Sequence, residues 1–228
     1  MTQFLRDQIN TVSKFFDGLK GFLRGSVPVL VSSNKTIQIR LHGRGGGGTV
    51  TAAKILAEVS ILLDGAGKIV RYAQAAPEFG PERGGAPVTA SVRISPKHIR
   101  VRNPIAHPDY LLILDGGLME TFRDKCLKGF NGKWILINSS RDLAYFNDLG
   151  FNVAAVDATK IARELGLGKN VNTAMLGAFC RIAPDSISLE KLLFVTEEKL
   201  KNIAQEKIQK NLEAIRIAYE LVKLKGMK

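Results

Sequence analysis

The stretch His42-Gly43-Arg44-Gly45-Gly46-Gly47-Gly48-Thr49-Val50-Thr51 connects two segments with different hydrophobic periods. Residues 36–41 alternate between polar and apolar side chains, which predicts a β-strand. The residues that follow, up to position 63, are rich in Ala, Ile, Leu and Val, which predicts a buried helix with Thr49 or Thr51 as its N-cap. The glycines therefore form a turn from strand to helix. Such a turn suits phosphate, because glycine lets a ligand approach the backbone and the first N–H groups of a helix lack intrahelical partners.

The rest of the chain repeats this alternation of strands and helices. Residues 68–76 and 88–94 predict strands, and residues 109–115, 132–138 and 151–157 predict parallel strands buried on both faces. The strand, turn, helix and strand of residues 36–76 form a unit that requires a right-handed crossover. These elements predict an α/β protein with an open, mostly parallel Rossmann-like sheet and helices on both faces. C-terminal helices follow, starting at Ser188 or Thr196. A long one among them has its buried stripe at Leu200, Ile203, Ile208, Leu212, Ile215, Tyr219 and Val222.

The N-terminal region predicts a separate amphipathic helix. In residues 1–25 the apolar side chains recur at steps of three and four, and three phenylalanines widen the stripe. Residues 25–35 then break the pattern. We expect residues 1–35 to form this helix and its linker, and residues 36–228 to form the α/β domain. The helix packs on its own domain, on a partner subunit or, less favourably, on a membrane surface.

Composition limits the classes of function. The sequence of 228 residues has no apolar run long enough to cross a bilayer and no secretory signal, so we expect a soluble, cytoplasmic protein. Neither Cys126 nor Cys180 has another Cys or a His at metal-ligand spacing. The net charge of +12 suits acidic partner subunits or an anionic cofactor. Nucleic acid is not expected, because Lys and Arg interleave with Glu at helical spacing over residues 187–228.

The glycine turn formally matches a dinucleotide-binding fingerprint through Gly43, Gly45 and Gly48. An NAD site also needs an acidic residue at the end of the second strand, where residues 73–77 read Ala-Gln-Ala-Ala-Pro. No Lys followed by Ser or Thr comes after the glycines, which excludes a Walker-type loop. Asp115 lies at the carboxyl end of a predicted strand, the edge at which open α/β sheets bind ligands.

Two further segments stand out beside the glycine turn. Residues 77–87 form a loop dense in Gly and Pro, in which Arg83 precedes two glycines and could hold an anion or make a surface ion pair. Residues 172–178 read Asn-Thr-Ala-Met-Leu-Gly-Ala, and Asn172 or Thr173 fits the N-cap of a small-residue helix.

Taken together, the segments 43–57, 79–86 and 172–178 resemble the gamma subunit, or gamma domain, of 2-oxoacid:ferredoxin oxidoreductases such as pyruvate synthase. The resemblance covers residues 36–222 and implies an enzyme that cleaves a 2-oxoacid to acyl-coenzyme A and CO2 and reduces ferredoxin, or runs in reverse. It places thiamine diphosphate, Mg and [4Fe-4S] clusters on alpha, beta and ferredoxin-like delta subunits. This chain alone is then inactive and encloses the coenzyme A side of the active centre. One departure is Arg44 followed by four glycines, where the family often has an extra polar residue.

We therefore predict that Gly43, Gly45, Gly48 and Arg83, with Asn172 as a weaker candidate, face a coenzyme A phosphate or a partner subunit. Purely structural turns are the competing interpretation of these residues. No catalytic residue and no metal ligand is expected on this chain, because the sequence has no nucleophile–base arrangement. The alternative function is a stand-alone NAD(P)-binding Rossmann oxidoreductase.

Overall fold

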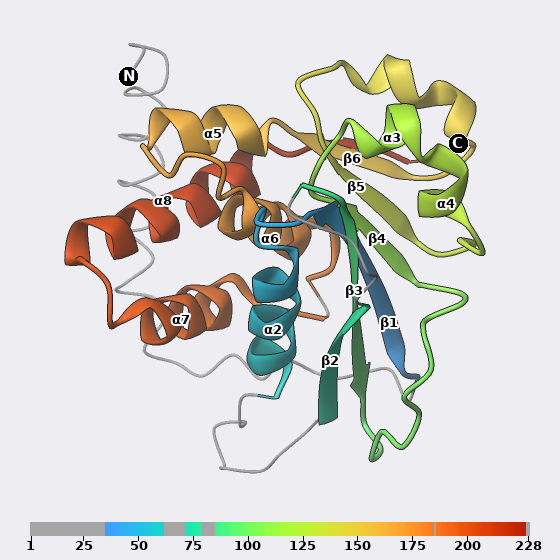
Figure 1. Ribbon diagram of the computed structural model, residues 1–228, viewed down its shortest axis with the longest axis horizontal. Helices are drawn as coiled ribbons and strands as arrows, with labels where there is room; N and C mark the ends of the chain where they lie inside the picture. The colour runs from blue at the N-terminus through green and yellow to red at the C-terminus, as the bar shows by residue number, and fades with distance from the viewer. Residues whose placement is uncertain (1–34, 62–71, 79–84, 185, 227–228) are drawn as a thin grey trace.

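A seven-stranded sheet forms the centre of the molecule, and helices cover both of its faces (Figure 1). The computed structural model describes residues 35–61, 72–78, 85–184 and 186–226. The predicted N-terminal helix, the Arg83 loop and the end of the predicted helix at position 63 lie outside these residues. Described strands run in the order β2-β3-β1-β4-β5-β6-β7 across the sheet.

The parallel part of the sheet agrees with the prediction from the apolar runs. β1 (Ile37–Arg44), β4 (Tyr110–Ile113), β5 (Trp134–Asn138) and β6 (Val153–Val156) are parallel neighbours in that order. Every residue of β4 and β6 is buried, as a strand covered on both faces requires. The carboxyl ends of these four strands therefore meet along one edge of the sheet.

The two outer parts of the sheet are antiparallel. β2 (Tyr72–Glu78) pairs with β3 (Pro87–Ser95), and β3 pairs with β1, both in antiparallel register. The short β7 (Lys223–Lys225) pairs antiparallel with β6. The second predicted strand thus does not lie beside the first, because β3 is inserted between them. The eight residues that connect β2 and β3 suffice for a hairpin, whereas a parallel crossover needs a dozen or more.

The helices divide between two hydrophobic cores, one on each face of the sheet. The larger core receives α2 (Thr49–Ser60), α5 (Ala158–Glu164), α6 (Asn172–Ile182), α7 (Leu189–Leu200) and α8 (Gln205–Leu221). The smaller core receives α3 (Leu118–Thr121), α4 (Arg123–Leu127) and the 3-10 helix η1 (Leu143–Leu149). Because α2 follows β1 on one face and α3 follows β4 on the other, the connections change faces between these two neighbouring strands. Such a switch point opens a crevice at the carboxyl edge.

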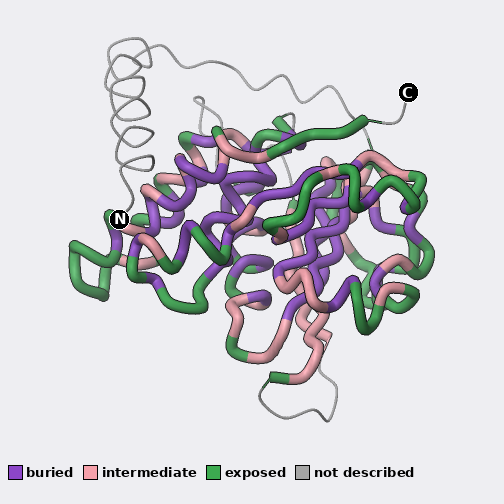
Figure 2. Tube along the Cα trace, turned by 90° about the horizontal axis from the view of Figure 1, so that it is seen from above, coloured by how far each residue is buried: buried purple, intermediate pink, exposed green. Residues whose placement is uncertain are grey.

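Buried residues run through the middle of the trace and exposed residues lie mainly at its periphery (Figure 2). Among the described helices of the larger core, α6 is the most buried. Ten of its eleven residues are buried, and it packs against α8. At Gly177 a Cβ atom would collide with the backbone carbonyl oxygen of Ile215, so glycine is what permits the two helices to approach this closely. Thr173 adds a buried hydrogen bond from its Oγ1 to Asn211 Oδ1 of α8, at 3.0 Å.

Three predicted details of the helices are wrong. The N-cap of α6 is Val171, because the Thr173 hydroxyl bonds to α8 and Asn172 is the first helical residue. The N-cap of α2 is Gly48 with φ of 80°, and Thr49 Oγ1 is buried without a hydrogen-bond partner among the described residues. The buried stripe predicted for the long C-terminal helix crosses a break, because Leu200 ends α7, α8 begins at Gln205 and Ile203 between them is exposed. The predicted start at Ser188 is confirmed, since Ser188 is the N-cap of α7.

Candidate functional site

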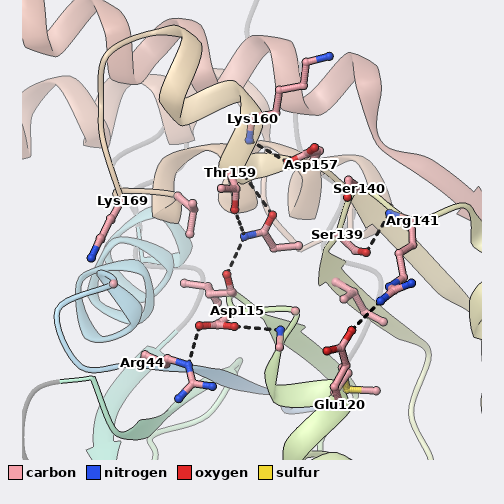
Figure 3. A pocket seen from close by; sticks show the side chains of 18 of the residues that line it. Arg44, Asp115, Glu120, Ser139, Ser140, Arg141, Asp157, Thr159, Lys160 and Lys169 are labelled. Carbon is pink, nitrogen blue, oxygen red and sulfur yellow. Dashed lines mark hydrogen bonds and ion pairs between the residues drawn. The ribbon is translucent and has the colours of Figure 1, made fainter.

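A cavity of about 1200 Å³ lies at the carboxyl edge of the parallel strands (Figure 3). The glycine turn after β1 forms one side of it, through Gly45, Gly46 and Gly47. The segments that follow β4, β5 and β6 and the turn before α6 supply the remaining lining. We call this space the carboxyl-edge cavity. It occupies the crevice expected at the switch point between β1 and β4.

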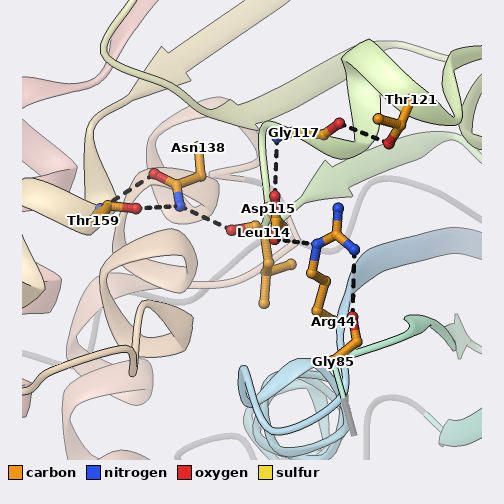
Figure 4. A network of polar contacts seen from close by, with 8 residues as sticks. All are labelled: Arg44, Gly85, Leu114, Asp115, Gly117, Thr121, Asn138 and Thr159. Atoms are coloured by element: carbon orange, nitrogen blue, oxygen red, sulfur yellow. Dashed lines mark hydrogen bonds and ion pairs between the residues drawn. The ribbon is translucent and has the colours of Figure 1, made fainter. Parts of the chain in front are cut away.

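An ion pair bridges the switch point. Arg44 at the end of β1 donates from Nε to Asp115 Oδ2 at 2.8 Å, and from Nη1 to the carbonyl oxygen of Gly85 at 3.3 Å (Figure 4). The other oxygen of Asp115 accepts from the Gly117 N–H at 2.9 Å, which shapes the turn into α3. Both side chains are more than a third exposed, so the ion pair fixes geometry more than it adds stability.

Asn138 joins three elements at the floor of the cavity. Its Nδ2 donates to the Leu114 carbonyl oxygen at 2.8 Å and to Thr159 Oγ1 at 2.9 Å, and its Oδ1 accepts from the Thr159 N–H at 3.2 Å (Figure 4). One buried amide thus satisfies groups from the end of β4 and the start of α5. Asp157 caps α5 by accepting from the Lys160 N–H at 2.8 Å. The strand ends are therefore held rigidly around the cavity.

Arg141 lies on the rim between two partners. Its Nη2 donates to Glu120 Oε1 at 2.9 Å, and its guanidinium stacks 4.2 Å from the centre of the Tyr145 ring. Tyr145 is half exposed, so this stacked pair presents a planar surface to the cavity mouth.

The charges that line the cavity leave a positive excess. Five cationic residues line it, against three acids. Asp115 and Glu120 are already paired with arginines, and Asp157 accepts from a backbone N–H. Within the described ranges this leaves Lys160, Arg163 and Lys169, all exposed, without a carboxylate partner. The cavity therefore favours an anionic ligand.

The predicted site residues do not all lie in one place. Gly45 lines the cavity, whereas Gly43 is buried beside Thr49 and its missing Cβ leaves room for the threonine hydroxyl. Gly48 and Asn172 lie against each other. A Cβ added to Gly48 would lie only 2.9 Å from Asn172 Nδ2. Arg83 is outside the described residues. A contact of Gly43, Gly45, Gly48, Arg83 or Asn172 with a ligand or partner remains a prediction.

Several lining residues were not proposed as site residues from the sequence, among them Asn138, Arg141, Lys160, Arg163 and Lys169. A signal for Asn138 was present, because it directly follows an apolar run in the sequence, as Asp115 does. Arg141 and Lys169 lie in polar turns of ordinary composition, and only the fold brings them to the same cavity.

The arrangement of β2 argues against a dinucleotide site of the Rossmann type. The strand extends to Glu78, so an acidic residue does stand at its carboxyl end, contrary to the sequence prediction. However, β3 separates β2 from β1, so Glu78 lies two strand spacings, about 10 Å, from the glycine turn. Glu78 Oε1 also accepts from Ser91 Oγ of β3 at 2.7 Å.

The described residues contain no group of three His, Cys, Asp or Glu that could hold a metal ion. Cys126 and Cys180 are both buried free thiols, and burial raises the pKa of each. None of the helices described has the combination of length and apolarity that a bilayer crossing needs.

Comparison with known proteins assigns the chain to a family. Residues 38–221 match the family described as pyruvate ferredoxin/flavodoxin oxidoreductase. Pyruvate synthase subunit PorC of Methanothermobacter marburgensis is 40% identical, over 83% of this chain and 99% of that protein. The pyruvate/ketoisovalerate oxidoreductases common subunit gamma of Thermococcus litoralis is 40% identical, over 81% and 96%.

Solved structures share the fold. Pyruvate oxidoreductase subunit PORC of Thermotoga maritima superposes with a TM-score of 0.69 at 32% identity, covering 83% of this chain and 98% of that one. The 2-oxoglutarate:ferredoxin oxidoreductase of Magnetococcus marinus superposes with a TM-score of 0.63 at 21% identity, over 83% of this chain and 31% of the other, a likeness of fold alone. Because the family match covers residues 38–221 and relatives are 40% identical over most of both chains, the chain belongs to the pyruvate ferredoxin/flavodoxin oxidoreductase family.

Proposed function

We propose that this chain is the gamma-type subunit of a 2-oxoacid:ferredoxin oxidoreductase, with pyruvate as the favoured substrate, and that its carboxyl-edge cavity receives coenzyme A. One observation carries the second part of the proposal. Lys160, Arg163 and Lys169 line the cavity without carboxylate partners in the described part of the chain. Coenzyme A presents a diphosphate and a 3′-phosphate, which are the kind of ligand that such a cluster attracts.

The form of the cavity supports the same ligand. Its volume of about 1200 Å³ accommodates a ligand of nucleotide size. Gly45, Gly46 and Gly47 have no side chains to keep a phosphate from the backbone, but the N–H groups of Gly45 and Gly47 already donate to the carbonyl oxygens of Ala86 and Arg44. The donors that a phosphate could use are therefore the N–H of Gly46 and the N-terminus of α2, which follows the glycines. The solved Magnetococcus marinus oxidoreductase that shares this fold has coenzyme A bound.

The chemistry would be divided between chains. In the proposed complex a 2-oxoacid loses CO2, two electrons pass to ferredoxin and the acyl group joins the coenzyme A thiol, or the steps run in reverse. Thiamine diphosphate with Mg and the [4Fe-4S] clusters supply carbanion and electron-transfer chemistry on alpha, beta and delta subunits. The described part of this chain contributes binding and orientation, since neither His nor Cys lines its cavity.

The assembled complex tests this role through the KM for coenzyme A. In the variant Arg163→Gln/Lys169→Gln we expect that KM to rise about tenfold, because two exposed charge contacts contribute roughly 0.5–1 kcal/mol each. The KM for pyruvate should not change. The matched control Lys223→Gln/Lys225→Gln removes the same charge from exposed β7 and should leave both constants unaltered. An unchanged KM for coenzyme A in the cavity variant would disprove the assignment.

A further inference from the structure

A second cationic region lies at the opposite edge of the sheet. Residues 96–109 connect β3 to β4, and Figure 1 shows them as a long green loop that runs beside the sheet. Lys97, His98, Arg100 and Arg102 are all exposed on this loop, and no acidic residue occurs in it before Asp109. The loop therefore carries a dense positive charge at the amino ends of the parallel strands.

A pocket of about 450 Å³ lies beneath the loop, and we call it the amino-edge pocket. No Asp or Glu is among its lining residues, whereas Arg93, Lys97 and Arg100 all line it, together with His98 and His107. Its charge is therefore even less balanced than that of the carboxyl-edge cavity.

Arg93 is the buried member of this group. Only 5% of the residue is exposed, and its Nη2 donates to the Asn103 carbonyl oxygen at 2.6 Å. No carboxylate lies within ion-pair distance of its guanidinium among the residues that the structure describes, although the more distant Glu78 acts on it electrostatically. A buried cation is costly unless it is paired. The pocket thus offers a guanidinium that a carboxylate could satisfy.

The loop is fixed in place over the pocket. Ser95 Oγ accepts from Thr36 Oγ1 at 3.0 Å and from the Lys97 N–H at 3.2 Å, which ties the start of the loop to β1. The His98 ring makes an edge-on contact with Tyr72 of β2, with ring centres 5.5 Å apart. These contacts fix the backbone at the start of the loop that carries the cationic side chains.

An apolar residue stands at the centre of the charged loop. Val101 is 54% exposed, with Arg100 and Arg102 on either side of it. Small-molecule sites are usually concave and mostly apolar. Arginine is enriched at protein interfaces, so one exposed valine flanked by two exposed arginines suits a protein partner better than a small molecule.

We propose that the amino-edge pocket and residues 97–102 dock an acidic segment of a different protein subunit, with one of its carboxylates inserted against Arg93. A second copy of this chain is a poor occupant, because its own net charge of +12 is of the same sign. The proposal goes beyond the function proposed above and does not depend on what the carboxyl-edge cavity binds.

Zero-length crosslinking of the purified native complex tests the contact directly. A carbodiimide converts a carboxylate to an O-acylisourea, and a lysine amine within ion-pair distance then attacks its acyl carbon, which forms an amide and releases a urea. We expect mass spectrometry to find Lys97 joined to an Asp or Glu of another subunit, and Lys97 to resist acetylation in the complex but not in the isolated chain. Lys223 and Lys225, exposed on the far edge strand, serve as controls.

Charge reversal tests the energetics in the same complex. In Lys97→Glu/Arg100→Glu we expect the partner subunit to dissociate at a lower NaCl concentration than in the wild type. The control Lys223→Glu/Lys225→Glu carries the same net charge and should behave as the wild type. We substitute these exposed residues because replacing the buried Arg93 could unfold the sheet. Full acetylation of Lys97 in the complex, a crosslink to a second copy of this chain, or equal dissociation of both variants would each overturn the proposal.

Discussion

His42 shows how strongly one position in β1 is constrained. The residue is 6% exposed, and its Nε2 accepts from Arg40 Nε at 3.1 Å. That bond requires a neutral ring with its proton on Nδ1, which lies 3.4 Å from Thr89 Oγ1. Burial, together with the charges of Arg40 and Lys125, lowers the pKa of His42 to about 3. The imidazole is thus a structural acceptor for a buried guanidinium.

This pKa makes stability depend on pH in a defined direction. An unfolded His titrates near pH 6.5, so below that pH the unfolded chain binds a proton that the folded chain excludes. The contribution of His42 to the free energy of unfolding is therefore fully present above pH 6.5. It falls as the pH drops toward 3, by at most about 1.4 kcal/mol per pH unit. We expect urea denaturation to show that the advantage of wild type over His42→Gln shrinks by about 2–3 kcal/mol between pH 7.5 and 4.5. A parallel loss in both proteins would contradict this account.

The residues of the site were partly predictable from the sequence. Asp115 could be placed at the ligand-binding edge because it directly follows a buried apolar run, and parallel strands end at one edge. Its partner Arg44 could not be named, because that pairing depends on β1 and β4 being neighbours, which the sequence does not state. The contact between Asn172 and Gly48 joins residues more than a hundred positions apart for the same reason.

Among the secondary-structure elements, the pair α6 and α8 has the sharpest steric requirement. Gly177 lies within α6, where replacing Gly with Ala ordinarily stabilises a helix by about 1 kcal/mol. Here the added Cβ would meet the carbonyl oxygen of Ile215, a backbone atom that moves only if α8 moves. We expect Gly177→Ala to lower the free energy of unfolding by about 1–3 kcal/mol. Amide hydrogen exchange should also show weaker protection along α8.

Gly150→Ala provides the control for that substitution. Gly150 has φ of 66° and no atom within 4 Å of its missing Cβ, so alanine there costs only the left-handed backbone strain of about 1–2 kcal/mol. Protection of α8 should remain at the wild-type level in this control. If Gly177→Ala were as stable as the wild type, the close approach of the two helices would not depend on glycine.

The elements themselves were predicted more reliably than their pairing. β4, β5 and β6 are apolar because both faces are covered, and that pattern is visible in the chain. The sequence analysis missed that β3 lies antiparallel between β1 and β2. A signal for it existed, because the connection from β2 to β3 is too short for a parallel crossover. The break between α7 and α8 had no such signal, since residues 201–204 contain neither Gly nor Pro and the apolar period continues through Ile203.

At the scale of the whole molecule, the sheet separates two positively charged regions. The carboxyl-edge cavity lies where the parallel strands end, and the amino-edge pocket lies where they begin. The eight residues of β1 span about 25 Å between them. That distance is well beyond the Debye length of about 8 Å at physiological ionic strength. The positive charge of the chain is thus divided between one surface proposed for coenzyme A and another proposed for a partner subunit.

The separation predicts that the two surfaces act independently. Arg163→Gln/Lys169→Gln should raise the KM for coenzyme A without changing the NaCl concentration at which the partner dissociates. Lys97→Glu/Arg100→Glu should lower that NaCl concentration and leave the KM for coenzyme A unchanged. In the combined variant the two effects should add within about 0.3–0.5 kcal/mol, because the sites share no side chain and lie more than 10 Å apart. Kinetics and salt dissociation of all four proteins measure this coupling. A coupling of 1 kcal/mol or more would mean that docking at the amino edge changes the geometry of the cavity, which would join the two surfaces in one conformational unit.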